Sequence, residues 1–230
     1  MTTPHSSSIK VETLEQFELL FVGDRSESMT SMGDSPWKGV CDWANEQAIE
    51  AQKNNYDTRI NIVVFDSESE CVLDSVSSNE WTTITENQAK EWMKPTGCTR
   101  LHDTVIEELE ILLHKKNKRG GECKAIFALF TDGKDNVSDS SLSQMNKAVK
   151  EARLQGVVCY FLAANQDAIA SGQRYGFDSR RCLTTGADPQ TSSQAYKTIS
   201  GACLRTTTTP HLDTGFTKLE RHYSAPQQPY

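Results

Sequence analysis

Residues 17–23 read Phe-Glu-Leu-Leu-Phe-Val-Gly, and residues 24–29 continue as Asp-Arg-Ser-Glu-Ser-Met. The first stretch is a short, nearly continuous apolar run, which is typical of a strand buried on both faces of a sheet. The second stretch is polar and places a carboxylate and two hydroxyls at alternate positions: Asp24, Ser26 and Ser28. An extended loop of this kind is expected to point all three side chains the same way.

The rest of the chain alternates short apolar runs with segments of helical periodicity. Further strands are expected at residues 59–65, 70–76, 123–130, 157–163 and 181–184, and helices at residues 36–53, 86–93, 100–114, 140–155, 167–175 and 189–204. The connection at residues 66–69 has hairpin length, which predicts that the strand after it is antiparallel. The pattern predicts an α/β fold: a Rossmann-like, doubly wound, mostly parallel six-stranded sheet with one antiparallel edge strand and helices on both faces.

The two ends of the chain lack a sustained apolar pattern. The first eight residues are polar, and residues 206–230 open with four threonines and carry three prolines. We therefore predict a flexible N-terminal tail at residues 1–15, one domain at residues 16–205, and a flexible Thr/Pro/Gln-rich tail at residues 206–230. Within this last tail, Phe216, Leu219 and Tyr223 are the side chains expected to form a small docking turn.

The composition argues against several classes of protein. Lys and Arg number 24 and Asp and Glu number 31, for a net charge of −7. Such a chain is disfavoured as a nucleic-acid binder, because affinity for phosphates rests mainly on Lys and Arg. No apolar run approaches the ~20 residues of a membrane span, and no hydrophobic signal core is visible. The 7 cysteines are odd in number, widely spaced and without a C-x-x-C pair, as expected of reduced thiols. We expect a cytoplasmic protein that binds neither nucleic acid nor membrane.

Three loops at the carboxyl ends of expected strands carry oxygen-bearing side chains. The loop that starts at Asp24 is the first; the second reads Thr-Gly-Cys-Thr-Arg-Leu-His-Asp at residues 96–103, and the third reads Thr-Asp-Gly at residues 131–133. Ligands of open α/β sheets bind beyond the carboxyl ends of the strands. These loops are therefore where the sequence places its candidate site.

If the strand ends are neighbours, two carboxylates and three hydroxyls converge there. The candidate ligands are Asp24, Ser26, Ser28, Thr99 and Asp132. An all-oxygen set without His or Cys suits a hard divalent cation. Because carboxylates are few, the set favours Mg²⁺ or Mn²⁺, which keep bound waters, over Ca²⁺.

This pattern resembles the von Willebrand factor type A (VWA) domain with a metal-ion-dependent adhesion site (MIDAS). The family signature is D-x-S-x-S in a first loop, Thr in a second and Asp in a third, and the five candidate ligands match it in type and order. The flanking T-G-x-T-x-L-x-D and T-D-G motifs match as well, and the resemblance covers about residues 17–204. Two residues depart from the pattern: Glu27 stands where many members have Gly, and Gly23 replaces the usual apolar residue.

The resemblance implies a mechanism. Ser26 and Ser28 bind the metal directly, Thr99 binds directly or through water, and Asp24 and Asp132 act largely through water or orient the hydroxyls. An Asp or Glu of a partner protein then completes the octahedron. The implied function is a metal-dependent protein–protein interaction module and not an enzyme.

Two other functions stay open at the level of the residues. One is a Mg²⁺-dependent phosphoesterase with Asp24 as nucleophile. Against it, the chain has no second acid two residues after Asp24, no P-loop, no G-x-S-x-G and no H-E-x-x-H. The other is a metal-free scaffold with a vestigial site, whose loop residues are ordinary caps and turn formers. The sequence does not indicate an oligomeric state.

Overall fold

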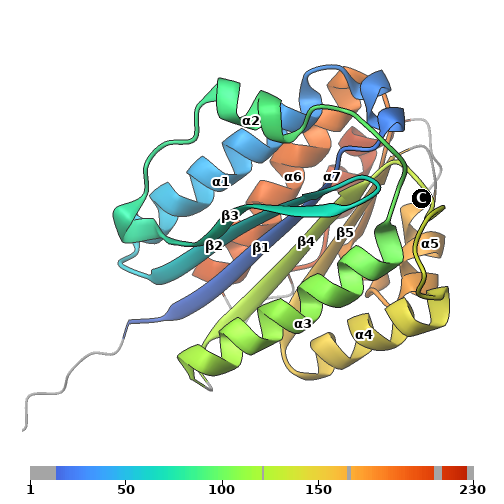
Figure 1. Ribbon diagram of the computed structural model, residues 1–230. Coiled ribbons are helices and arrows are strands. Elements are labelled where there is room, and N and C mark those ends of the chain that lie inside the picture. Colours follow the sequence, from blue (N-terminus) through green and yellow to red (C-terminus); the bar gives the residue numbers. More distant parts are fainter. Residues whose placement is uncertain (1–13, 121, 165–166, 210–213, 227–230) are drawn as a thin grey trace, which may run out of the picture.

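The structure is a computed structural model that describes residues 14–120, 122–164, 167–209 and 214–226 (Figure 1). Its described part contains one six-stranded sheet with the order β3-β2-β1-β4-β5-β6. The strands are β1 (Gln16–Asp24), β2 (Asp57–Phe65), β3 (Ser69–Ser77), β4 (Lys124–Thr131), β5 (Val157–Ala164) and β6 (Cys182–Thr185). Strand β3 is antiparallel to β2 and the other pairs are parallel, which confirms the predicted fold class.

Helices cover both faces of this sheet (Figure 1). One face packs against α1 (Ser35–Lys53), α2 (Glu86–Trp92) and α6 (Pro189–Thr208), and the other against α3 (Leu101–Arg119), α4 (Leu142–Leu154) and α5 (Ala168–Tyr175). A seventh helix, α7 (Lys218–Ser224), and the 3-10 segments Glu27–Met32, Ser78–Glu80 and Ser179–Arg181 complete the described elements. None of the helices in the described ranges is both long and apolar enough to cross a membrane.

The sequence of β1 explains its central place in the sheet. Phe17, Leu19 and Phe21 belong to the core on the α1 and α6 side, whereas Leu20 and Val22 belong to the core under α3 and α4. Both sets are buried because side chains alternate between the two faces of a strand. A strand buried on both faces reads as a continuous apolar run, as observed at residues 17–23.

The register of the parallel strands brings their carboxyl ends to one edge. Gly23 lies opposite both Val64 of β2 and Phe130 of β4. The segments that follow β1 and β4 therefore leave the sheet side by side, at the upper right of Figure 1. This edge carries the predicted site.

The C-terminal boundary of the domain differs from the prediction. Helix α6 continues to Thr208, and Phe216 is buried with its ring centroid 5.4 Å from that of Tyr160. Helix α7 is fixed to β6 by Arg221, which donates to the carbonyl of Cys182 at 2.6 Å. The prediction of a flexible tail from residue 206 is thus wrong for residues 206–209 and 214–226. The remaining residues of both predicted tails lie outside the described part, except that residues 14 and 15 are exposed.

Candidate metal centre

Backbone hydrogen bonds hold the three predicted loops together. The amide of Glu27 donates to the carbonyl of Gly97 at 3.3 Å, and the amide of Thr96 donates to the carbonyl of Arg25 at 2.9 Å. The amide of Asn136, which follows β4, donates to the carbonyl of Thr99 at 3.1 Å. The loop at residues 96–100 is therefore bound on one side to the loop after β1 and on the other to the loop after β4.

Asp24 lies at the base of the site. It is the last residue of β1 and is 0% exposed. Its Oδ1 accepts a hydrogen bond from the amide of Ser26 at 2.8 Å, and its Oδ2 accepts one from the hydroxyl of Thr131 at 2.5 Å. Both carboxylate oxygens are engaged, so Asp24 fixes the start of the loop behind the hydroxyls.

The hydroxyls of the buried Ser26 and the exposed Ser28 contact each other, but not in the way expected from the sequence. Ser26 has an extended backbone, whereas Ser28 lies in the 3-10 segment Glu27–Met32, closed by a bond from the Met29 amide to the Ser26 carbonyl. The expected extended loop is therefore wrong, and the 3-10 turn brings the hydroxyls together. Their Oγ atoms are 3.1 Å apart, and the Ser28 hydroxyl donates to Asp132 Oδ1 at 2.7 Å.

Thr99 is held against the third loop. Its side chain is buried, and its amide donates to Asn136 Oδ1 at 2.8 Å. A Cβ on Gly133 would lie 3.1 Å from the Thr99 hydroxyl oxygen, so the glycine leaves room for that hydroxyl. The structure thus joins Asp24, Ser26, Ser28 and Asp132 in one hydrogen-bonded chain and places Thr99 beside the loop of Asp132. That the five residues bind a metal stays a prediction.

The electrostatics of the site favour a cation. Burial raises the pKa of Asp24 to about 6, although the hydrogen bonds from Thr131 and Ser26 lower it. The negative charge of Asp132 raises this pKa further. Burial also raises the pKa of Asp132, although the hydrogen bond that it accepts from Ser28 lowers it. Two partly desolvated carboxylates repel each other, and a bound cation would remove that cost.

One buried hydroxyl near these carboxylates has no partner among the described residues. The Tyr196 hydroxyl on α6 is fully buried and makes no hydrogen bond there. Burial raises its pKa well above the usual range, and the charges of Asp24 and Asp132 raise it further. Buried polar groups are normally satisfied by protein or by ordered water, and such water fits a cation that keeps part of its hydration shell.

The spacing of the oxygens is that of ordinary hydrogen bonds, and it is also compatible with neighbouring ligands of an octahedral ion. Neighbouring ligands of Mg²⁺, bound at ~2.05 Å, are ~2.9 Å apart along an octahedron edge. The Ser26–Ser28 and Ser28–Asp132 oxygens are 3.1 and 2.7 Å apart, close to this value. The described residues contain no group of three or more His, Cys, Asp and Glu that could hold a metal. At the candidate site, the side-chain oxygens of Ser26, Ser28 and Asp132 lie within hydrogen-bond distance of one another in sequence.

Two supporting residues were not predicted as part of the site. Thr131 donates to Asp24, and Asn136 binds the amide of Thr99. Thr131 is the first residue of the T-D-G motif. Because a Thr at the end of a strand is common, nothing in the sequence indicated that its hydroxyl would bind Asp24. Asn136 lies three residues after that motif, in the same loop. Its bond across two loops depends on tertiary structure and leaves no mark in the local sequence.

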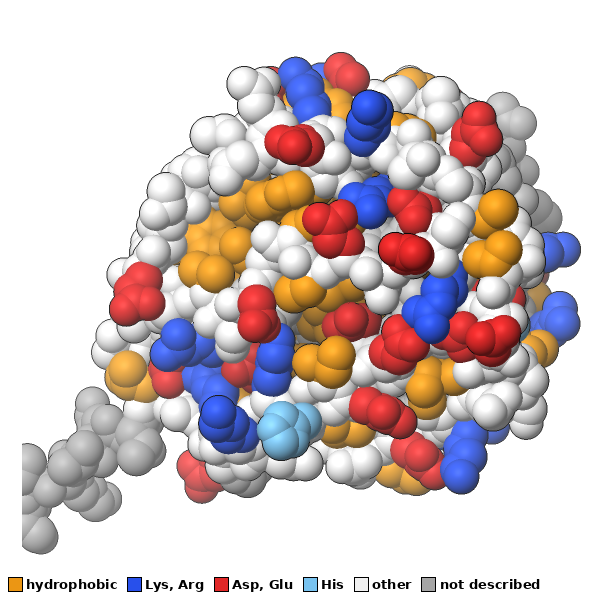
Figure 2. Space-filling view, viewed as in Figure 1, with side chains coloured by type: hydrophobic (Ala, Val, Ile, Leu, Met, Phe, Trp, Pro, Cys, Tyr) orange, Lys and Arg blue, Asp and Glu red, His pale blue; other side chains and the backbone are white. Residues whose placement is uncertain are grey.

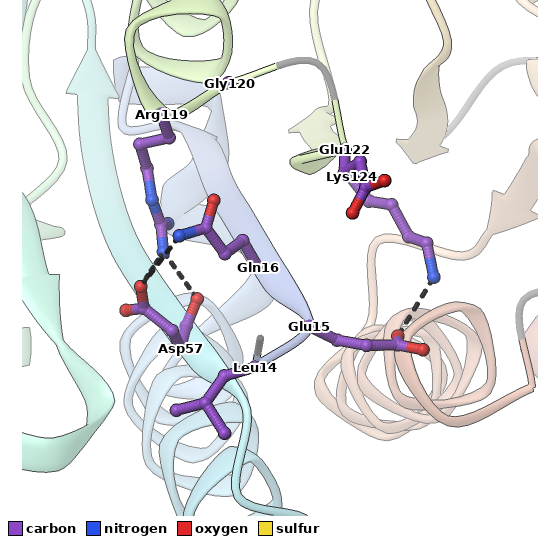
Figure 3. Close-up of a pocket in the computed structure, with 8 residues that line it drawn as sticks. All are labelled: Leu14, Glu15, Gln16, Asp57, Arg119, Gly120, Glu122 and Lys124. Atoms are coloured by element: carbon purple, nitrogen blue, oxygen red, sulfur yellow. Dashed lines mark hydrogen bonds and ion pairs between the residues drawn. The ribbon is translucent and has the colours of Figure 1, made fainter. Parts of the chain in front are cut away.

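A hollow of about 810 Å³ lies at the other end of the sheet, near the amino ends of β1 and β2 (Figure 3). It contains none of the five predicted ligands. Four of its charged side chains form two ion pairs: Arg119 with Asp57 at 2.7 Å, and Lys124 with Glu15 at 2.9 Å. We assign no site to it.

Comparison with known proteins adds a family and a fold. A model of the von Willebrand factor type A domain matches residues 18–199, whereas no curated protein sequence matches the chain. Among solved structures, the chain is similar to proximal thread matrix protein 1 from the mussel byssus with a zinc-occupied MIDAS motif (16% identity, TM-score 0.56, covering 83% of this chain and 46% of that chain). It is also similar to the pilus adhesin SpaC of Lactobacillus rhamnosus GG, with 13% identity, a TM-score of 0.60, and coverage of 84% of this chain and 30% of that chain. The minor pilin PilB of Streptococcus sanguinis is similar too, with 14% identity, a TM-score of 0.57, and coverage of 85% of this chain and 63% of that chain. The chain spans less than two thirds of each of these proteins, and at such identities the likeness concerns the fold.

Proposed function

Because the chain belongs to the von Willebrand factor type A domain family, whose members are typically metal-dependent adhesion or interaction modules, we propose that it joins a partner protein through a divalent cation. The cation is Mg²⁺ or Mn²⁺, and the partner supplies an Asp or Glu. The proposed ligands are Asp24, Ser26, Ser28, Thr99 and Asp132. The observation that carries the proposal is the bonded chain from Asp24 through the two serines to Asp132, which spans two loops of the sheet edge.

The residues have distinct roles in this proposal. Ser26 and Ser28 offer neutral hydroxyl oxygens to the ion, and Asp132 orients the Ser28 hydroxyl by accepting a hydrogen bond from it at 2.7 Å. Asp24 is held by Thr131 and stabilises the loop from below. When bound, the cation supplies a Lewis-acidic position. Because its direct protein ligands are mostly neutral, it keeps the charge needed to attract a carboxylate.

Access to the site fits a protein partner. Ser28 is exposed, as is Glu27 beside it, whereas Asp24 and Ser26 are buried. A partner thus approaches from the Ser28 side. The negative charge of Glu27 at the rim favours a partner that pairs its carboxylate with a nearby basic residue.

The phosphoesterase alternative is less consistent with the geometry. A nucleophilic Asp needs a free oxygen that faces the substrate. Asp24 is 0% exposed, and both of its oxygens accept hydrogen bonds. We propose that the protein turns over no substrate. Appearance of nitrophenol from p-nitrophenyl phosphate with Mg²⁺, lost in Asp24→Asn, would contradict this.

We also propose that the protein functions in the cytoplasm. All 7 cysteines are free, and five of them are buried. Free thiols persist in reducing compartments. Fractionation of the source cells is expected to place the protein in the cytoplasmic fraction, and recovery from the medium or cell surface would contradict the proposal.

The proposed function is tested by a Mn²⁺ titration followed through water-proton relaxation. Mn²⁺ bound to the protein enhances relaxation by its remaining waters. A short peptide with an exposed Glu is expected to displace such a water and lower the enhancement, and the same peptide with Gln is the control. Absence of Mn²⁺ binding with either peptide supports the scaffold alternative, and equal effects of the Glu and Gln peptides refute the carboxylate ligand.

A further inference from the structure

The sheet face under α3 is apolar except in one place. Leu20 and Val63 belong to its core, but Asn61 lies opposite Leu20 in the β1–β2 register. Glu18, two residues before Leu20 on β1, is also buried. Figure 2 shows the outer surface of the molecule on the side where α3 lies in front, with hydrophobic side chains in a hollow bordered by acidic and basic ones.

The neighbouring buried polar groups are paired. Glu18 accepts hydrogen bonds from Arg119 at 3.1 Å and from the Asn61 side-chain amide at 3.2 Å. Lys115 donates to Asn61 Oδ1 at 2.6 Å and to Asp74 Oδ1 at 2.5 Å. Lys115 and Arg119 of α3 thus have their charges engaged, as expected for polar groups under a helix.

Glu108 is different from these neighbours. It lies on α3, is 8% exposed, and makes no hydrogen bond or ion pair with any residue in the described ranges. It lines a cavity of about 200 Å³, together with apolar side chains of α3, β1 and β2. Burial raises the pKa of its carboxyl to about 7; the charge of Lys115 lowers this pKa, and those of Glu107 and Asp74 raise it. Its oxygens are not among the fully buried atoms without a partner, so they face the cavity, where a ligand that donates hydrogen bonds could replace water.

We propose that this cavity binds a small organic ammonium ion, with Glu108 receiving the ammonium group and the apolar wall formed by Leu20, Val63 and Leu112 holding a short alkyl chain. A carboxylate only accepts hydrogen bonds, and an alkylammonium only donates them. The volume is below the ~300–1,000 Å³ of sites for drug-sized ligands, so the ligand has few heavy atoms.

The charges of the cavity select this class of ligand. Lys115 and Asp74 neutralise each other, so the charge left on the cavity wall is the single negative charge of Glu108. A monocation neutralises it. A metal ion fits less well, because the other oxygen-bearing side chains of the cavity, Asn61 and Asp74, already accept hydrogen bonds from Lys115, whose ammonium also repels a divalent charge.

The test is a titration of the full-length protein with n-butylammonium chloride, followed by ¹H–¹⁵N and methyl NMR. The pH is ~8.5, above the pKa of Glu108 and below the ~10.4 of an alkylammonium group. We expect saturable shifts confined to the signals of Leu20, Val63 and Leu112. Glu108→Gln should weaken binding at least ~10-fold, whereas Glu110→Gln, an exposed change on the same helix, should leave it unchanged.

A second variant, at the entrance of the cavity, tests the proposal without changing Glu108. Ile111 lines the cavity but is 45% exposed, so Ile111→Trp adds bulk at the entrance and leaves the carboxylate in place. It should also weaken binding. The proposal is overturned if wild type shows no saturable shift, if 1-butanol binds as tightly as butylammonium, or if Glu108→Gln retains the affinity.

Discussion

Replacing Glu108 with Gln should stabilise the protein above neutral pH. The carboxyl is 8% exposed, unpaired among the described residues, and has its pKa raised by burial to about 7. The folded state therefore holds this proton more tightly than the unfolded state, whose value is near 4.5. As pH rises, the unfolded chain loses the proton first. The free energy of unfolding of the wild type thus falls between about pH 4.5 and pH 7.

The size of the effect follows from the shift. A change from 4.5 to about 7, at ~1.36 kcal/mol per pKa unit, corresponds to about 3 kcal/mol at pH 8. Gln has nearly the same shape and does not titrate. The variant and the wild type should therefore be equally stable near pH 4, and the variant should be more stable by about 3 kcal/mol at pH 8.

Urea denaturation at a series of pH values measures this difference. Glu110→Gln makes the same chemical change at an exposed position of α3 and should show no such trend. The reasoning is refuted if the difference in free energy of unfolding between Glu108→Gln and wild type does not change with pH. It is also refuted if the wild type is the more stable of the two at pH 8.

Two further substitutions test the packing around the sheet. Arg119→Met removes the charge that pairs with Glu18, which is 1% exposed. Because Glu18 is then buried without its partner, the free energy of unfolding should fall by about 3–5 kcal/mol. A loss below about 1 kcal/mol, measured by urea denaturation, would contradict a buried ion pair. Gly39→Ala places a methyl group against the ring of Tyr196 and should lower the free energy of unfolding by about 1–3 kcal/mol, although Ala has the better helix propensity. A raised melting temperature of this variant would show that α1 and α6 are packed less closely than in the structure.

Much of the fold and the site is encoded locally. The apolar run at residues 17–23 predicts a central strand, because such a strand meets hydrophobic neighbours on both faces. Parallel strands share one carboxyl edge, so the polar loops after β1 and β4 were expected to meet if these strands were neighbours, and Ser28 does contact Asp132. That β1 and β4 are neighbours was learned from the structure and not from the order of the motifs.

Other features depend on distant contacts. Helix α3 extends to Arg119, beyond the predicted end at 114, because Lys115 and Arg119 bind polar atoms of β1, β2 and β3. The segment after residue 213 has weak apolar periodicity, yet Phe216 packs against Tyr160 of a strand far away in the chain. Local patterns do not carry such pairings.

Metal-dependent stability tests the central claim most directly. Thermal unfolding is measured with Mg²⁺ or Mn²⁺ against EDTA for wild type, Ser26→Ala and the matched control Ser143→Ala, whose serine is exposed on α4 outside the three loops of the site. A cation at ~100 times its dissociation constant stabilises by about 2.7 kcal/mol, which raises the melting temperature by about 5–10 °C for a chain of this size. The account predicts this shift in wild type and Ser143→Ala and its loss in Ser26→Ala. The same shift in Ser26→Ala, or none in wild type, would contradict the proposed metal site.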